Sequence, residues 1–88
     1  MEIKQEAEKE MKRMVEAFEK VEVDFQPKAK EFHDFAKNYF EDGKHFFEKE
    51  KFVQAFEAFI ISWAYIDIGL KLGFFKVPNQ IKKYFTID

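Results

Sequence analysis

The chain has 88 residues, of which 36% are charged and 47% hydrophobic, and its formal net charge is -2. A length of this order accommodates one domain, and the absence of cysteine excludes disulfides and thiolate metal sites, so side-chain packing must supply the stability. Because 17 acidic residues outnumber 15 basic ones and Arg13 is the sole arginine, the composition argues against a nucleic-acid partner.

The first residues, MEIKQEAEKEMKR, are charged from the second position onward, which is unlike a signal peptide. The longest nearly apolar run, Ala58 to Ile66, is much shorter than the roughly 20 residues that a membrane span needs. We therefore expect a cytoplasmic protein that has no contact with a membrane.

Apolar residues recur at spacings of four and three in the first quarter of the chain, which predicts an amphipathic helix over about residues 2–22. The apolar stripe comprises Ile3, Ala7, Met11, Met14, Phe18, Val21 and Phe25. The opposite face carries two charge pairs at i,i+4, Glu8 with Lys12 and Glu16 with Lys20. So narrow a stripe fits one helix of an intramolecular bundle, and it leaves open a coiled-coil contact between chains.

A second helix is predicted over about residues 26–48. Asp24 is expected to cap its first turn, and Pro27 fits only within that turn. The inward residues are Ala29, Phe32, Ala36, Tyr39, Gly43 and Phe46, with Phe35, Phe40 and Phe47 widening the stripe. Because a glycine in a helix costs about 1 kcal/mol relative to alanine, Gly43 predicts the close approach of another helix.

A short charged turn at residues 48–51 makes the third predicted helix, about residues 51–72, an antiparallel neighbour of the second. Gly73 suits the left-handed position that ends a helix. The middle of this helix has only three polar residues, Glu57, Ser62 and Asp67. Since they are spaced by five, they form no common polar face, and the helix needs burial on more than one side. It is either the central element of the domain or half of an intermolecular contact.

The remaining residues, 74–88, permit a short helix that carries Ile81, Tyr84 and Phe85 on one side. This tail could cover the third helix within the chain or be held by a neighbouring molecule. The sequence thus predicts an all-α fold, a three-helix up-and-down antiparallel bundle with a short C-terminal helical tail, in which residues 1–88 form a single domain.

The predicted hairpin has spacings similar to those of one tetratricopeptide unit, at Tyr39, Gly43, Phe46, Ala55 and Phe59. Ser62 and Asp67 depart from that pattern, and an array of such repeats needs about three copies to be stable. We interpret the similarity as shared helix-hairpin packing.

A second set of residues lies between Tyr39 and Phe75: Tyr39, Glu41, Asp42, Ala55, Asp67, Gly69, Leu72 and Gly73. In these residues the chain resembles the archaeal domain-of-unknown-function 357 family. The resemblance implies a short archaeal protein folded as a three-helix, up-and-down bundle, and it implies no activity. The chain departs from the family pattern at Glu50, where that pattern often has a turn glycine.

Few residues could carry catalysis. His33 and His45 are twelve residues apart and lie on different turns, while Asp42 and His45 could give a metal two ligands, with a nearby glutamate as a third. We interpret these residues as solvated side chains and expect no metal, no cofactor and no catalytic residue. The only serine, Ser62, lies in the apolar helix, and no cysteine is present, so the chain is not expected to be an enzyme.

Asp67 is a carboxylate within an otherwise apolar helix, beside Trp63 and Ile66. One interpretation makes it a ligand-orienting or proton-accepting group in a pocket. The other pairs it with Lys71 at i,i+4, or with Tyr39 or the tail, because a buried and unpaired carboxylate is costly.

The primary hypothesis is a non-enzymatic interaction or self-assembly module that uses the apolar surface of the third helix and the tail to bind an unknown protein or a second copy. The candidate surface residues are Tyr39, Trp63, Tyr65, Asp67, Phe74, Phe75, Tyr84 and Phe85. The alternative is a binder of a small apolar or aromatic ligand, held in a cavity between the helices and bordered by Tyr39, Trp63, Tyr65 and Asp67.

Overall fold

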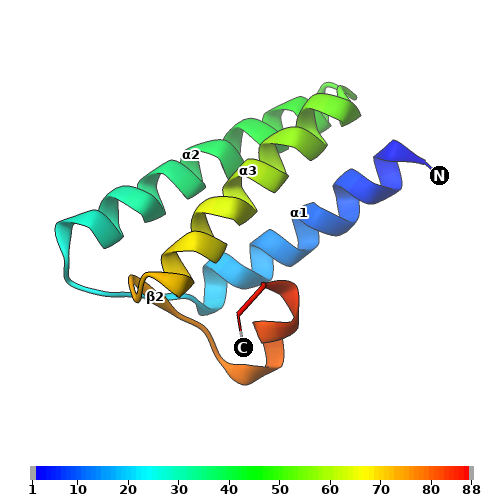
Figure 1. The fold of residues 1–88 in the computed structure, drawn as a ribbon. Helices are drawn as coiled ribbons and strands as arrows, with labels where there is room; N and C mark the ends of the chain where they lie inside the picture. The colour runs from blue at the N-terminus through cyan, green and yellow to red at the C-terminus, as the bar shows by residue number, and fades with distance from the viewer. Residues whose placement is uncertain (1, 88) are drawn as a thin grey trace.

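The computed structural model describes residues 2–87. Three long helices dominate it, and a short tail folds back against them (Figure 1). In chain order the elements are α1 (Ile3–Lys20), β1 (Glu22–Val23), α2 (Pro27–Glu48), α3 (Phe52–Lys71), β2 (Phe75–Lys76) and the 3₁₀ helix η1 (Asn79–Tyr84). Each long helix is one to three residues shorter than its expected range.

α3 is the central element. It forms an antiparallel hairpin with α2, and α1 runs beside it, while α1 and α2 have little contact with each other (Figure 1). The fold is the expected all-α, three-helix bundle with a short helical tail. The apolar stripe of α1 is buried within the molecule, where Ala7, Met14 and Ala17 are almost inaccessible. This stripe is therefore used in the intramolecular bundle.

The hairpin is tight because small residues stand where the helices meet. A Cβ atom added at Gly43 would lie 2.5 Å from Cε1 of Phe59, which is fully buried. Close approach of α3 thus explains the glycine in the middle of α2, as expected. Ser62 also lies at this contact, and its hydroxyl donates a 2.7 Å hydrogen bond to the carbonyl oxygen of Ala36. A polar side chain is tolerated in the core here because it has a partner.

Two residues with positive φ end the helices of the hairpin. Gly73 follows α3 with φ of 80°, and it occupies the expected left-handed position. Glu50 lies in the turn between α2 and α3 with φ of 60°, although non-glycine residues seldom adopt this conformation. A glutamate therefore occupies a left-handed position of this turn.

The connection between α1 and α2 differs from the expectation. Asp24 does not cap α2, which begins after Gln26 without a side-chain cap, and the Asp24 carboxylate instead accepts a hydrogen bond from the Gln26 side chain. Phe25, expected on the apolar stripe, is fully exposed, because the chain turns away from α1 at Val21. Residues 22–23 then pair with residues 75–76 as a two-stranded antiparallel ribbon. This ribbon joins the connection to the tail.

One helix of the described chain, α3, is long and apolar enough to cross a membrane by length and composition, with a mean hydropathy of 1.3 in its most apolar window. The apolar run from Ala58 to Ile66 thus belongs to a longer apolar helix. α3 packs against both other long helices, and 39% of this window is buried within the described chain.

Candidate interaction surface

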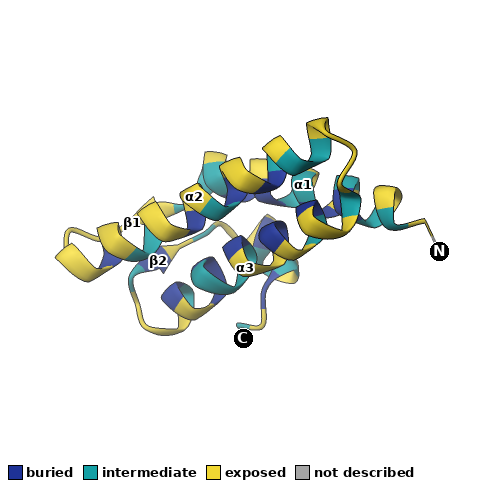
Figure 2. Cartoon of the chain, turned by 90° about the horizontal axis from the view of Figure 1, so that it is seen from above, coloured by how far each residue is buried: buried dark blue, intermediate teal, exposed yellow. Residues whose placement is uncertain are grey.

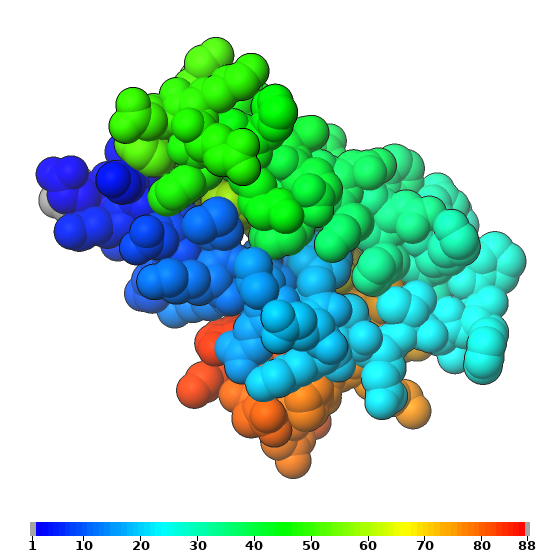
Figure 3. Space-filling model, turned by 180° about the vertical axis from the view of Figure 1, so that it is seen from behind, coloured from blue at the N-terminus to red at the C-terminus, as the bar shows by residue number. Residues whose placement is uncertain are grey.

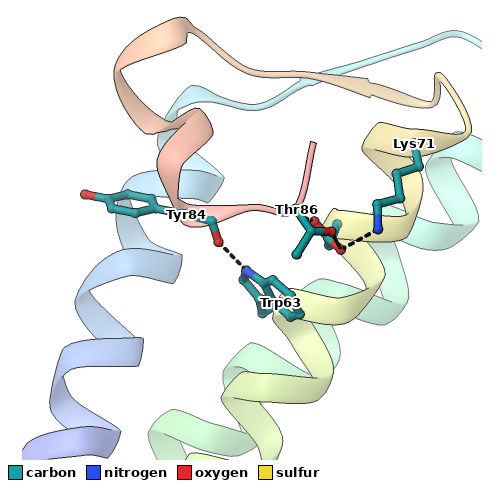
Figure 4. Close-up of polar contacts among 5 residues, drawn as sticks. Trp63, Lys71, Tyr84 and Thr86 are labelled. Carbon is teal, nitrogen blue, oxygen red and sulfur yellow. Dashed lines mark hydrogen bonds and ion pairs between the residues drawn. The ribbon is translucent and has the colours of Figure 1, made fainter. Parts of the chain in front are cut away.

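The tail closes over one side of α3 and satisfies its buried carboxylate. The backbone N–H and the hydroxyl of Thr86 donate hydrogen bonds of 2.8 and 2.7 Å to the two oxygens of Asp67, and Lys71 Nζ lies 3.5 Å away (Figure 4). Burial raises the pKa of Asp67, but the hydrogen bonds from Thr86 and the charge of Lys71 outweigh it and hold the pKa below its ordinary value. Asp67 is thus a structural anchor for the tail, as the paired interpretation expected.

Trp63 and Tyr84 make a second connection between the tail and the helices. The indole N–H of Trp63 donates a 2.7 Å hydrogen bond to the carbonyl oxygen of Tyr84 (Figure 4), and its ring stacks on Phe85 at 6.3 Å. The Tyr84 hydroxyl donates to the Glu16 carboxylate on α1. Hydrogen bonds from Lys20 and Tyr84 lower the pKa of Glu16. The hydrogen bond between Tyr84 and Glu16 raises the pKa of Tyr84. The tail therefore packs in cis, against both α1 and α3.

The aromatic residues expected to border a ligand cavity fall into two separate groups. Tyr65 stacks between Phe35 and Tyr39 of α2, with ring centroids 5.4 and 5.9 Å away. Trp63 and Asp67, by contrast, are occupied by the tail. The four residues of the small-ligand hypothesis thus do not surround a common space.

Three of the candidate surface residues lie in the interior. Phe75 and Phe85 are core residues, 3% and 8% exposed, and Asp67 is buried beside them. Phe75 packs over Gly69 of α3, where an added Cβ would collide with its ring. The aromatic tail thus completes the core of this chain and does not present these rings to a partner. The remaining candidates, Tyr39, Trp63, Tyr65, Phe74 and Tyr84, are half-buried.

The apolar residues that the tail leaves uncovered lie on the outward face of α3. Five large ones, Val53, Ile60, Ile61, Ile68 and Leu72, are 36% to 56% exposed, and exposed positions recur along this helix in Figure 2. Two exposed charges, Glu57 and Lys71, and half-buried Ala64 share the face. At 100° per residue, all eight lie within 80° of the direction of Ala64, opposite the buried side of the helix. We call these eight residues the α3 stripe.

Open hollows flank the amino-terminal half of the α3 stripe. One, of about 220 Å³, lies between α2 and α3 and includes Tyr39, Phe46 and Ile61 in its walls. The other, of about 280 Å³, is formed by Phe56, Glu57, Ile60 and Ile61. The surface is thus uneven and apolar, with few charges.

The sequence indicates spare apolar surface on this helix, but it does not identify the residues of the stripe. The signal is present, since Ile60, Ala64 and Ile68 repeat at four. This repeat is not informative by itself, because the buried face of α3 is equally apolar. The periodicity of apolar residues therefore does not distinguish the exposed face from the buried face.

The opposite side of the molecule offers a less favourable surface. Val15, Phe18 and Phe40 lie in a groove between α1 and α2, but Lys37 and Lys44 cross it with their ammonium groups 4.9 to 5.5 Å from the aromatic rings. Figure 3 shows this side, with α1 between α2 and the tail. The lysine side chains cover apolar area that would otherwise be available to a partner.

The histidines and the serine have structural surroundings. His33 packs edge-on against Phe18 and Phe75, and burial lowers its pKa, while His45 is exposed. Within residues 2–87, no three His, Cys, Asp or Glu side chains are grouped so that they could hold a metal ion. The Ser62 hydroxyl is buried and bonded to a backbone carbonyl.

Comparison with known proteins places the chain in a family. The family model "Protein of unknown function (DUF357)" matches residues 5–75. The chain belongs to the DUF357 family. The match begins in α1, so the family likeness extends well beyond the carboxyl-terminal half that carried the resemblance in the sequence.

A solved structure supports the DUF357 fold. The crystal structure of protein AF1782 from Archaeoglobus fulgidus, also of DUF357, is 29% identical to this chain and superimposes with a TM-score of 0.75, covering 86% of this chain and 93% of the other. No curated protein matches the chain significantly. Membership of DUF357 thus establishes the bundle and leaves the function unassigned.

Proposed function

We propose that this DUF357 protein is a cytoplasmic, non-enzymatic interaction module that binds a helical segment of another protein chain through the α3 stripe. One observation carries the proposal: the outward face of the central helix has five exposed large apolar residues. A helix on the surface of a bundle normally has polar residues on that face. Contiguous exposed apolar residues of this kind are typical of interaction surfaces.

The shape of the surface favours a protein over a small molecule. The hollows beside the stripe are open, and each is smaller than the roughly 300–1,000 Å³ of a typical ligand pocket. The stripe instead follows the whole of α3, which at 20 residues is about 30 Å long. An elongated apolar face is the form of surface on which a partner helix packs, with its side chains inserted between those of the first helix.

Site-specific photo-crosslinking tests the proposal. With p-benzoylphenylalanine at Ile61, in cells that make the protein at its native level, irradiation should give a discrete crosslinked product. When the chain that carries the crosslinker also carries Ile60→Ser and Ile68→Ser, the crosslinked product should disappear. The matched control carries the crosslinker at Lys12, which is exposed on α1 and paired with Glu8, and should give no such product. If Ile61 gives no product, or both positions give the same products, the proposal is wrong.

A further inference from the structure

The α3 stripe has a symmetric pattern about Ala64. Four residues away in either direction stand Ile60 and Ile68. Seven residues away stand Glu57 and Lys71, which are the only charges of the stripe and have opposite sign. Around Ala64 the stripe thus repeats an isoleucine and a charged residue in reverse order, and the two charges are complementary.

From this pattern we infer that the partner is a second copy of the chain, bound antiparallel through α3 with the two-fold axis at Ala64. The inference rests on the proposed function and names its partner. In an antiparallel pair that crosses at residue 64, a residue that precedes Ala64 lies at the same height along the helices as the partner's residue that follows Ala64 by the same number of positions. Ile60 then packs beside Ile68 of the partner, in a layer on each side of Ala64.

The charges select a second copy over an unrelated helix. In this arrangement Glu57 of each chain faces Lys71 of the other, so two ion pairs form at symmetric positions. Lys71 can reach across, because its side chain is 50% exposed, and the Asp67 carboxylate beside it retains its bonds from Thr86. Binding of an unrelated helix does not require opposite charges at symmetric positions in this chain. A two-fold dimer does require them, because each chain must supply both members of the ion pair.

Ala64 fits the crossing point because its methyl group lets two helices approach closely. Interaxial distances of 8–10 Å are set by the side chains at the contact, and alanine belongs at the short end. Val53 and Ile61 have no exposed counterparts, since Phe75 and Asp67 stand in those positions and are buried. They therefore lie at the margins of the contact. One helix pair is small beside standard interfaces of about 800 Å² per partner, so we expect dissociation in the micromolar range.

Charge reversal tests the inference by sedimentation equilibrium from about 1 μM to 1 mM. The wild-type chain should dimerise. Glu57→Lys and Lys71→Glu should each weaken the dimer at least tenfold, because like charges then face each other at both ends of the contact. An equimolar mixture of the two single variants should associate as tightly as the wild type, and so should the double variant. Glu8→Lys is the control: this residue lies on α1, its side chain is 47% exposed, and its replacement should leave the association unchanged.

A disulfide test remains informative if Lys71→Glu fails to fold. The natural chain has no cysteine, so a single introduced thiol can pair only with its own copy. Ala64→Cys should oxidise to a covalent dimer whose circular dichroism spectrum is unchanged, and Lys12→Cys should remain monomeric under the same conditions.

The possible results separate this inference from the proposed function. A wild-type chain that stays monomeric at 1 mM, yet is crosslinked through Ile61 to a different protein, overturns the inference and leaves the proposed function standing. A dimer that charge reversal does not weaken also overturns the inference. Absence of any product at Ile61 overturns the proposed function itself.

Discussion

Polar side chains inside α3 each have a partner from another element. Ser62 donates to a carbonyl of α2, and Asp67 accepts from the tail. Within the described chain, no buried side-chain nitrogen or oxygen atom lacks a hydrogen-bond partner. Polar groups that would be costly if buried alone thus act as connections between specific elements.

Asp67→Asn should lower the free energy of unfolding by about 1.5–3 kcal/mol, because hydrogen bonds to a charged group are lost. The folded pKa of Asp67 is below the ordinary 3.8, so its carboxylate stabilises the fold fully above that value, and this contribution is lost as the pH falls toward the folded pKa. The variant should therefore lose less stability than the wild type on acidification below about pH 4. Urea denaturation followed by circular dichroism measures both effects.

Asp34→Asn is the matched control for this change. Asp34 is exposed and pairs with Lys30, so its replacement should cost less than about 0.5 kcal/mol. Equal losses in the two variants would contradict the anchoring role of Asp67.

At the scale of elements, the α2–α3 turn contains the one non-glycine residue of the described chain that has a positive φ. Glu50 adopts a left-handed conformation that costs a non-glycine residue about 1–2 kcal/mol. The neighbouring Lys49 has a negative φ and avoids this cost.

Glu50→Gly should raise the free energy of unfolding by about 1 kcal/mol, since glycine adopts positive φ without a steric cost. Lys49→Gly should lower it by a few tenths to 1 kcal/mol, because the added freedom of the unfolded chain is not offset by relief of strain. Thermal and urea denaturation of the two variants measures both changes. A loss of stability in Glu50→Gly would show that its side chain contributes more than its backbone costs.

The long helices could be predicted because their signals are local. Apolar spacing determines where a helix lies, and residues such as Gly43 and Gly73 report close packing and helix ends. The ribbon of residues 22–23 and 75–76 could not be predicted, since two-residue strands have no period and depend on contacts between distant parts of the chain. The conformation just before α2 could not be predicted either, because it also depends on a distant contact: the backbone N–H of Asp24 donates a hydrogen bond to the carbonyl oxygen of Phe74 in the tail.

At the scale of the whole molecule, the tail is part of the core. Ile81 and Phe85 are buried beside residues of the three long helices, so the fold is completed only when the last residues pack. The sequence left open whether this tail packs in cis, because an aromatic segment has the same composition in either case. Because composition does not distinguish the two cases, the sequence predicts the phenylalanines of the tail on the surface, whereas the exposed apolar face is on α3.

Two phenylalanine substitutions separate core from surface. Phe85→Ala should lower the free energy of unfolding by about 3–5 kcal/mol, because it leaves a cavity under the tail. Phe25→Ala should change it by less than about 0.5 kcal/mol, since that ring is fully exposed. Urea denaturation monitored at 222 nm provides the measurement. A small effect in both variants would mean that the tail does not pack against α3 in solution.

The contact of Trp63 with the tail has a consequence for observing the molecule. Trp63 is the only tryptophan, and its indole touches the tail through the Tyr84 carbonyl and the Phe85 ring. Release of the tail would expose the indole to water and shift its fluorescence emission to longer wavelength, while the helices could remain intact. The chain therefore contains an intrinsic optical probe of this one contact, which can report how often the last residues open without any attached dye.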